Sequence, residues 1–295
     1  MKILLTGKNG QVGFELRRAL APLGEVVAVD QATCDLGDAD AVRALVRRVA
    51  PDVIVNPAAY TAVDKAESDR DTAWAVNAVA PGVLGEEGAR LGALVVHYST
   101  DYVFDGAKDG AYTEDDVPAP QGVYGSSKLA GELALAAANP RHLILRTSWV
   151  VGAHGGNFAK TMLRLAAERD QLNVVADQFG APTSAALLAD LTAQLIGRYQ
   201  RERATSFPYG TYHVAASGET SWHAYARFVV EAALAAGKTL KAGPGDIHPL
   251  ATAQYPTPAR RPANSRLDTQ RFRAAFGLRL PPWQEGVGHV LEQLF

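Results

Sequence analysis

The first half of the chain alternates short apolar runs with longer segments of helical periodicity. Each run holds five to seven residues, mostly Val, Ile and Leu, without regular polar interruptions. Such a run is too short for a helix, and its continuous apolar character is typical of a strand that is covered on both faces. The predicted strands are residues 2–6, 25–30, 52–56, 93–99 and 142–147. A chain with this pattern is expected to build a buried parallel sheet.

The segments between these strands are rich in Ala, Leu, Arg and Glu, with apolar residues three and four positions apart. This spacing places the apolar side chains on one face of a helix. The predicted helices are residues 11–21, 39–50, 66–91 and 124–138. Strands that alternate with helices indicate repeated βαβ units. We therefore predict an α/β fold in which helices cover the sheet.

The second half departs from this alternation. The predicted elements are a helix at 157–168, a strand at 172–175, a helix at 185–199, a strand at 211–215, a helix at 221–236 and an irregular Pro- and Gly-rich stretch from 243 to 262. We predict that residues 1–150, with about 184–220, form a sheet domain. Residues 151–183 and about 221–295 are predicted to form a smaller substrate-binding lobe.

The composition excludes several kinds of partner. The 295 residues carry 29 basic and 31 acidic side chains, scattered along the chain. This near balance offers no electrostatic footprint for nucleic acid or for an anionic membrane surface. No apolar stretch approaches the roughly 18 residues of a membrane span, and no signal-peptide core follows the first residues. The single cysteine, Cys34, excludes an intrachain disulfide. We expect a cytoplasmic protein.

A glycine-rich turn follows the first predicted strand and opens the first predicted helix. Its sequence is Gly7-Lys8-Asn9-Gly10-Gln11-Val12-Gly13. Glycines here allow a tight turn and a close approach to a pyrophosphate, while the helix N-terminus presents free N–H groups. Asp30 ends the second predicted strand, close to the usual offset of an acid that receives a ribose hydroxyl. The pattern predicts a dinucleotide site on a Rossmann-type doubly wound sheet, with an ordinary strand-to-helix turn as the alternative.

A tyrosine and a lysine stand four residues apart, at Tyr124 and Lys128, and on a helix they share one face. The pKa of a free tyrosine is near 10, and a nearby cation lowers it toward the range of a general acid. Thr100, at the end of the fourth predicted strand, is placed to hydrogen-bond a substrate carbonyl. Taken singly, an exposed helix pair and a hydroxyl that satisfies backbone groups explain these residues as well. Together they predict the site of a reductase.

The glycine spacing and the order Thr100, Tyr124, Lys128 resemble those of the extended short-chain dehydrogenase/reductases. More specific strings along the whole chain resemble one family within that group, the dTDP-4-dehydrorhamnose reductases. These strings are Thr61 to Glu67, Ser99 to Phe104, Arg146 to Val150, Asn157 to Lys160, Asp177 to Thr183 and Tyr255 to Pro262. The resemblance implies hydride transfer from NADPH or NADH to the C4 carbonyl of dTDP-4-dehydro-L-rhamnose, a small-molecule nucleotide sugar.

The same resemblance implies roles for individual residues. Tyr124 would protonate the developing alkoxide, Lys128 would tune Tyr124 and bind the nicotinamide ribose, and Thr100 would polarise the carbonyl. The implied cofactor residues are Gly7, Gly10, Gln11, Val12, Gly13, Asp30, Asp35, Leu36, Ala58, Ala59, Tyr60, Thr61, Tyr98, Tyr124 and Lys128. The implied substrate residues are Thr100, Asp101, Val63, Trp149, Arg260 and Arg261.

Several of these residues have a structural alternative. Asp35 can instead cap the next helix, and Trp149 can belong to the core. Arg260 and Arg261 suit an anionic pyrophosphate, or form a solvated surface pair. The cofactor preference stays open, because Asp30 repels a 2′-phosphate whereas the family often accepts both cofactors.

One departure from the family concerns metal. Some members bind Mg²⁺ through glutamates shared across a dimer interface. Glu15 is kept here, but the other two positions fall on Ala186 and Gln293. These neutral side chains do not replace hard carboxylate ligands. We therefore predict no metal site, and either a monomer or a metal-independent homodimer.

Two other functions fit part of the pattern. A nucleotide-sugar epimerase or dehydratase shares the fold and the pair Tyr124 and Lys128. A dehydratase, however, adds a second acid after Asp101, where this chain has Tyr102. A non-catalytic nucleotide-binding regulatory subunit shares the glycine turn but has no use for a tuned phenol.

Overall fold

Six parallel strands form the central sheet of the computed structural model, which describes residues 1–202 and 206–295. They are β1 (Lys2–Leu5), β2 (Glu25–Ala28), β3 (Val53–Asn56), β4 (Leu94–Thr100), β5 (His142–Thr147) and β10 (Gly210–His213). Their order across the sheet is β10-β5-β4-β3-β1-β2. The crossovers from β1 to β2 and from β2 to β3 therefore run in opposite directions. Open α/β sheets bind ligands at such a reversal, beyond the carboxyl ends of the strands.

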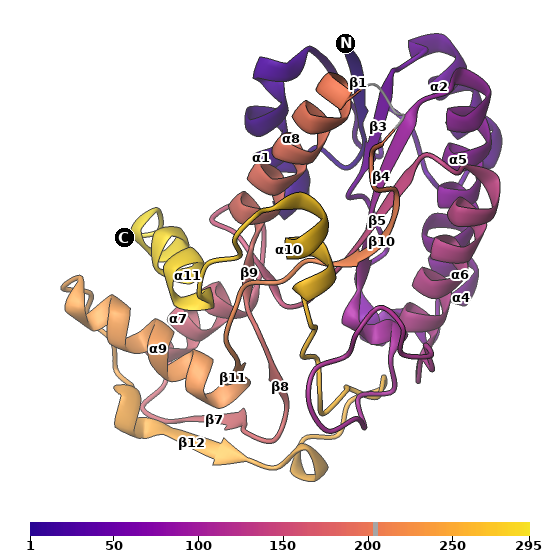
Figure 1. Cartoon of the computed structure of the whole chain (residues 1–295). Coiled ribbons are helices and arrows are strands. Elements are labelled where there is room, and N and C mark those ends of the chain that lie inside the picture. Colours follow the sequence, from indigo (N-terminus) through magenta and orange to yellow (C-terminus); the bar gives the residue numbers. More distant parts are fainter. Residues whose placement is uncertain (203–205) are drawn as a thin grey trace.

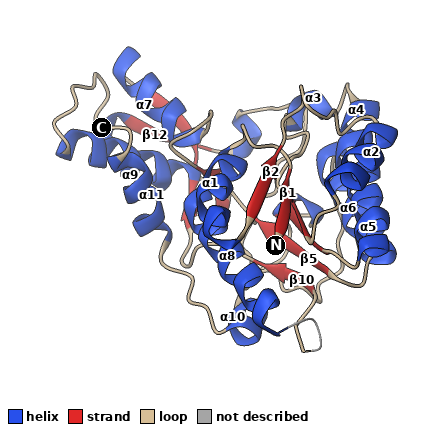
Figure 2. Ribbon diagram, turned by 90° about the horizontal axis from the view of Figure 1, so that it is seen from above, coloured by secondary structure: helices blue, strands red, loops and turns tan. Residues whose placement is uncertain are grey.

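Helices cover both faces of this sheet (Figure 1 and Figure 2). One face carries α1 (Gln11–Leu20), α8 (Ala185–Glu202) and α10 (Gln270–Phe276). The other carries α2 (Ala39–Val49), α5 (Ala80–Leu91) and α6 (Val123–Ala138). The doubly wound α/β fold expected from the sequence is confirmed.

The strand runs are continuously apolar because successive side chains enter two different cores. Ile3 and Leu5 of β1 pack toward α1 and α8, whereas Leu4 between them packs toward α2 and α5. In β4, Val96 belongs to the first core and Val95 to the second. Both kinds of position are buried, so the period-two pattern of a half-exposed strand is absent from the sequence.

The single helix predicted over residues 66–91 is wrong. The structure has α3 (Val63–Ala66), α4 (Arg70–Trp74), a π-helical turn η2 (Ala75–Val79) and then α5. Pro81 has no N–H for the carbonyl of Asn77, which breaks the α-helical ladder there. The freed carbonyl faces Gly131 of α6, where a Cβ atom would lie only 2.0 Å from it. The turn thus lets α6 pack closely against this segment.

A second core lies beside the sheet, in the lower left of Figure 1. It contains α7 (Phe158–Glu168), α9 (Trp222–Ala235), α11 (Trp283–Glu292) and the parallel pair β7 (Leu172–Val175) and β12 (Ile247–Leu250). Two further short pairs join β6 (Val150–Val151) to β9 (Thr183–Ser184) and β8 (Phe179–Gly180) to β11 (Thr220–Ser221).

The sequence patterns missed three elements of the last 53 residues, namely β12, α10 and α11. Phe272 and Phe276 of α10 pack in the core of the sheet although they belong to the range predicted for the smaller lobe. The limits of the two domains stay a prediction. Among the described residues, no helix combines the length and apolar character needed to cross a membrane.

Candidate active site

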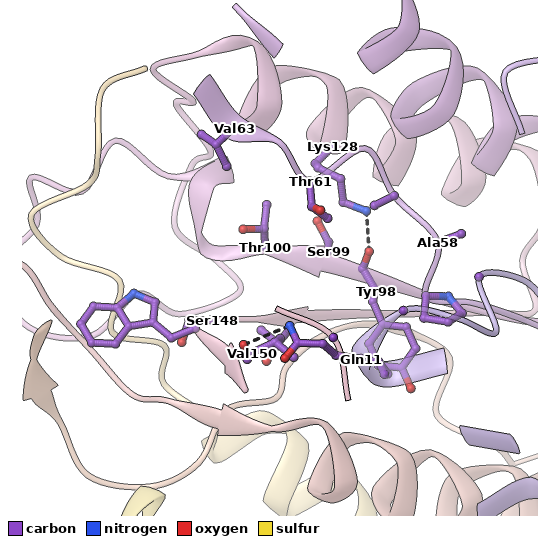
Figure 3. A pocket seen from close by; sticks show the side chains of 18 of the residues that line it. Gln11, Ala58, Thr61, Val63, Tyr98, Ser99, Thr100, Lys128, Ser148 and Val150 are labelled. Atoms are coloured by element: carbon purple, nitrogen blue, oxygen red, sulfur yellow. Dashed lines mark hydrogen bonds between the residues drawn. The ribbon is translucent and has the colours of Figure 1, made fainter. Parts of the chain in front are cut away.

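A cavity of about 680 Å³ opens beyond the carboxyl ends of β1, β3, β4 and β5. It brings together most of the residues predicted for cofactor and substrate (Figure 3). From the predicted cofactor residues it collects Gly7, Gly10, Gln11, Val12, Gly13, Ala58, Ala59, Thr61, Tyr98, Tyr124 and Lys128. From the predicted substrate residues it collects Val63, Thr100, Asp101 and Trp149.

The glycine turn is shaped by contacts within the protein and by free space toward the cavity. Gly7 has a φ of +59°, and a Cβ atom on Gly13 would lie 2.0 Å from the Gly7 carbonyl oxygen. A Cβ atom on Gly10 would meet the same oxygen at 3.4 Å, an ordinary contact. Gly10 also caps α1 without a side chain, so the first N–H groups of that helix face the cavity unobstructed. This arrangement fits the pyrophosphate of a dinucleotide.

A second cavity of about 370 Å³ shares Gly7, Ala58 and Ala59 with the first. The remaining predicted cofactor residues line it: Asp30, Asp35, Leu36 and Tyr60. Val29, Cys34 and Leu36 give it an apolar wall, which suits the flat face of an adenine ring. Asp35 accepts a hydrogen bond from the backbone N–H of Gly37, and Asp38 rather than Asp35 caps α2.

Asp30 has a basic partner that the sequence analysis did not single out. Lys8 Nζ lies 3.1 Å from Asp30 Oδ2, and the Thr33 hydroxyl donates to Asp30 Oδ1 at 2.7 Å. The Thr33 and Lys8 hydrogen bonds hold the pKa of Asp30 well below its usual range, so its carboxylate is ionised at neutral pH. The ribose end of the predicted cofactor site therefore carries one negative and one positive charge.

Tyr124 is the second residue of α6, and it lines the cavity together with Thr100. The helix reaches this position because Gly125 meets the Tyr102 carbonyl, where a Cβ atom would lie 2.1 Å from the oxygen. Burial raises the pKa of Tyr124 to about 12, while the Thr100 hydroxyl acts in the opposite direction. The Thr100 hydroxyl also lies 3.1 Å from Asp101 Oδ1 and accepts from the Tyr102 N–H at 3.2 Å.

Lys128 is turned toward the sheet, and this corrects one expectation. Its Nζ donates to the Tyr98 carbonyl at 2.6 Å (Figure 3). The same Nζ lies 3.1 Å from His97 Nε2. Burial raises the pKa of Tyr124, which was expected to be lowered. Burial lowers the pKa of Lys128 itself to about 8, against the carboxylate of Glu132. Strand β4, not the phenol, therefore holds the lysine.

Three buried polar groups beside Tyr124 and Lys128 lack partners within the described protein. They are Ser99 Oγ, Thr147 Oγ1 and Asp101 Oδ2, and all three residues line the cavity. Burial raises the pKa of Asp101 to about 6, against hydrogen bonds from Ser265 and Thr100. Unpaired buried polar atoms are costly, so their position in a cavity indicates a ligand that pairs with them.

Trp149 lines the cavity together with a residue that the sequence analysis missed, Trp222. Their rings stack with centroids 3.6 Å apart. Trp149 has a φ of +50°, a left-handed conformation that costs energy in a residue with a side chain. Gly180 makes room for the indole, because a Cβ atom there would lie 2.7 Å from the ring. Spacing could not reveal Trp222, since it begins a helix more than 70 residues later.

Arg260 and Arg261 lie in a third cavity, of about 570 Å³, rather than in the first. Arg261 Nη2 lies 2.6 Å from Asp64 Oδ2, and Arg260 donates to Gln121 at 3.2 Å. Arg261 is thus half of an ion pair, and the binding of a pyrophosphate by the two arginines stays a prediction. Arg261 Nη1 is buried without a partner among the described residues. Tyr255 and Pro256 extend the same cavity.

Within residues 1–202 and 206–295, no three His, Cys, Asp or Glu side chains gather closely enough to hold a metal ion. The absence of a metal stays a prediction, because a site shared between two copies of the chain would have this appearance as well.

The parallel sheet, the glycine turn and the cavity with Thr100, Tyr124 and Lys128 define a Rossmann-type protein of the dehydrogenase/reductase class. The whole chain, residues 1–295, matches the family described as RmlD substrate binding domain. It is 50% identical to a dTDP-4-dehydrorhamnose reductase of Shigella flexneri, over 100% of this chain and 98% of that protein. The chain belongs to the dTDP-4-dehydrorhamnose reductase family.

Two solved structures are also similar to this chain. A dTDP-4-dehydrorhamnose reductase from Clostridium acetobutylicum is 36% identical, with a TM-score of 0.91 over 100% of this chain and 99% of that one. A dTDP-4-dehydrorhamnose reductase from Bacillus anthracis, in complex with NADP, is 34% identical, with a TM-score of 0.89 over 99% of each chain.

Proposed function

We propose that the chain reduces the C4 carbonyl of dTDP-4-dehydro-L-rhamnose to give dTDP-L-rhamnose, with NADPH or NADH as the hydride donor. The observation that carries this proposal is one cavity that joins the glycine turn to Thr100, Tyr124 and Lys128 in a chain of this family. The relatives named for this activity match it along their whole length.

The first two cavities suit the cofactor. The N–H groups at the start of α1 and the space at Gly10 would receive the pyrophosphate. The apolar wall with Leu36 would hold the adenine, and Asp30 with Lys8 would meet the ribose. The unpaired hydroxyl groups of Ser99 and Thr147 would face the nicotinamide end. When bound, NAD(P)H supplies the hydride, which no side chain of this protein can supply.

The substrate oxygen would sit between Thr100 and Tyr124. Thr100 gives up its bond to Asp101 and donates to the carbonyl oxygen, while Tyr124 transfers its proton as the alkoxide develops. With its raised pKa the phenol of Tyr124 is protonated at neutral pH, so it holds the proton that a general acid must give. The cation of Lys128, which lines the same cavity, would stabilise the phenolate once the proton has left.

The third cavity suits the diphosphate of the substrate. Arg260 and Arg261 supply positive charge there, and Asp64 holds Arg261 in place. Trp149 and Trp222 form an apolar platform at the first cavity, on which the face of the sugar ring can rest.

The decisive experiment measures NAD(P)H oxidation with dTDP-4-dehydro-L-rhamnose and compares wild type with Tyr124→Phe. We expect turnover by the wild type and a loss of at least about 100-fold in kcat for the variant, because general acid catalysis contributes 10² or more. Tyr209→Phe is the matched control, since Tyr209 packs against Tyr199 and Phe207, away from the cavity. No turnover by the wild type, or full turnover by Tyr124→Phe, would overturn the proposal.

The alternative hypothesis, that the chain is a nucleotide-sugar epimerase, makes a different prediction about the purified protein. An epimerase returns its cofactor to the starting state, so it retains tightly bound NAD⁺. We expect the purified chain to carry no stoichiometric nicotinamide, measured by absorbance after acid precipitation of the protein.

We further propose a cytoplasmic enzyme that is a monomer or a metal-independent homodimer and that binds no nucleic acid. Ala186 and Gln293, which stand at two of the family's glutamate positions, support independence from Mg²⁺. Sedimentation with and without EDTA tests it: a change in mass on adding EDTA would contradict the proposal.

A further inference from the structure

The loop between β6 and α7, residues 152–156, lies against the glycine turn that precedes α1. His154 Nε2 lies 3.0 Å from the carbonyl oxygen of Asn9, and the His154 ring stacks on Phe14 with centroids 4.2 Å apart and an interplanar angle of 7°. A carbonyl oxygen only accepts, so the imidazole N–H donates this bond. The β6–α7 loop is thus fastened to the part of the molecule that suits a pyrophosphate.

Asn157, which caps α7, ties the β6–α7 loop to the same turn. Its Oδ1 accepts from the Lys160 N–H at 3.1 Å. Its Nδ2 donates to the Gly152 carbonyl at 2.7 Å and to Gln11 Oε1 at 3.0 Å, and Gln11 lines the main cavity. Gly155 has a φ of +77°, and a Cβ atom there would lie 3.2 Å from Gln11 Cγ. A glycine at this position lets the loop approach the turn without strain.

Lys160 fixes the orientation of two peptide groups in the loop. Its Nζ donates to the carbonyl oxygens of Ala153 and Gly155, at 2.8 Å in each case. The C=O and the N–H of a planar trans peptide point in opposite directions, so the N–H of Gly156 points away from Lys160. Gly155 and Gly156 line the main cavity, whereas Lys160 does not. The Gly156 N–H is therefore directed to the side of the cavity.

The surroundings of Gly156 suit a diphosphate. Apart from its chain neighbours, no heavy atom lies within 4 Å of a Cβ atom built on Gly156, so the cavity is open at this residue. The first N–H groups of α1 reach the same cavity, and Gly10 leaves them unobstructed. The Lys160 ammonium adds a positive charge on the other side of the peptide. A diphosphate would thus meet N–H donors from both the glycine turn and the β6–α7 loop.

We propose that Lys160 is a positioning residue for the cofactor. It holds the peptide between Gly155 and Gly156 so that the Gly156 N–H donates to the pyrophosphate, opposite the start of α1. The inference rests on the proposed function, which brings NAD(P)H into this cavity. It gives a role to the end of the string from Asn157 to Lys160, which the proposed function leaves without one. The diphosphate of the sugar nucleotide has the same chemistry, so the tests separate the two ligands.

The first test observes the Gly156 amide and needs no turnover. The protein is labelled with ¹⁵N-glycine, and the Gly156 signal is assigned by its loss in Gly156→Ala, for which the structure has room. We expect ADP-ribose to shift the Gly156 and Gly10 amide signals downfield. Adenosine, which lacks the diphosphate, and dTDP should leave the Gly156 signal in place. A Gly156 signal that stays while Gly10 responds to ADP-ribose, or that responds equally to adenosine or dTDP, would overturn the inference.

The second test removes the donors of Lys160. Lys160→Met keeps the apolar stem and loses the bonds to both carbonyl groups. We expect the Kd of ADP-ribose to rise about tenfold, because a hydrogen bond to a charged group is weakened, with unchanged affinity for adenosine and dTDP. Displacement of NADPH, followed by its fluorescence, gives the affinities. Lys241→Met is the matched control, since Lys241 Nζ also donates to a backbone carbonyl, that of Glu168 at the other end of α7.

The outcomes separate the inference from the proposed function. An equal loss of affinity for ADP-ribose and adenosine in Lys160→Met would show that the loop only shapes the cavity, and an unchanged Kd of ADP-ribose would show that its peptide binds no diphosphate; either overturns the inference. A wild type that binds ADP-ribose through Gly156 but does not reduce the nucleotide sugar would refute the proposed function alone. If neither Gly10 nor Gly156 responds to ADP-ribose, the cofactor site and the inference fail together. The wild-type Gly156 signal decides the matter where Lys160→Met does not fold.

Discussion

The indole rings of Trp149 and Trp222 stack with their centroids 3.6 Å apart and an interplanar angle of 15°. Trp149 follows the end of β5 and Trp222 begins α9, so this pair joins the carboxyl edge of the sheet to the second core. Both residues line the main cavity. The platform that we propose for the sugar is therefore built by the two parts of the molecule together.

Replacing Trp222 by leucine should weaken substrate binding more than catalysis. Leucine keeps apolar bulk but loses the stacked ring, which contributes about 1 kcal/mol, or roughly five-fold in KM for the sugar nucleotide. Steady-state kinetics at saturating cofactor measure the effect. Trp74→Leu is the control, since Trp74 is 39% exposed and does not line the cavity. An equal rise of KM in both variants would contradict the platform.

Lys8 should govern tolerance for the 2′-phosphate of NADPH. In wild type its ammonium lies 3.1 Å from the Asp30 carboxylate and offsets its repulsion of a phosphate. In Lys8→Met the carboxylate remains alone, and we expect KM for NADPH to rise about tenfold, equal to about 1.4 kcal/mol, with little change for NADH. Arg17→Met serves as a control for charge alone. A similar rise for both cofactors would show that Lys8 has no selective role.

Gly10 and Gly13 should respond differently to a methyl group. In Gly13→Ala the new Cβ would lie 2.0 Å from the Gly7 carbonyl oxygen, so the protein without cofactor should lose about 1–3 kcal/mol of stability. In Gly10→Ala the closest contact is 3.4 Å, so stability should hold while cofactor affinity falls. Urea unfolding and fluorescence titration with NADPH measure the two effects. Full NADPH affinity in Gly10→Ala would place the pyrophosphate elsewhere.

Asp101 should make the protein less stable as the pH rises. Its pKa is about 6 in the folded protein against an ordinary value of 3.8, because burial disfavours the carboxylate. Between those values the folded state binds more protons than the unfolded state, so the free energy of unfolding falls with rising pH. At about 1.4 kcal/mol per pKa unit, the whole contribution is about 3 kcal/mol, and about 2.4 kcal/mol of it is lost between pH 4 and pH 7.

Asp101→Asn should remove that contribution. Urea unfolding at pH 4, 5.5 and 7 compares the variant with wild type, and Asp40→Asn is the control at an exposed carboxylate. Parallel pH dependences for Asp101→Asn and wild type would show that the carboxyl group is not the cause.

The sequence predicted the strands well because burial on both faces leaves a continuous apolar run, as in β4 and β5. It predicted a single long helix over residues 66–91, where the structure has several shorter elements. The π-helical turn at Asn77 depends on a partner, Gly131, that lies on another helix. It missed α10, whose seven residues are too few for a clear periodicity and whose apolar side chains Phe272 and Phe276 are buried by the sheet.

In the site, too, local sequence patterns were predicted correctly and contacts between distant residues were not. The glycine turn and the tyrosine four residues before Lys128 are local patterns, and they line one cavity as expected. Contacts across strands leave no local trace, so the pairing of Lys8 with Asp30 and of Lys128 with His97 could not be read from spacing. The lowering of the Tyr124 pKa by Lys128 was expected wrongly for this reason.

Strand β10 pairs with β5, yet it is made from residues 210–213, long after the chain has left the sheet. During synthesis on the ribosome, the first 150 residues therefore emerge with the edge of β5 unpaired and with one face lacking α8 and α10. An unprotected edge of this kind is a template for aggregation. A gene fragment cut after the fifth strand should consequently yield inclusion bodies rather than a minimal cofactor-binding module, and engineers who wish to graft the catalytic half must carry the later segments with it.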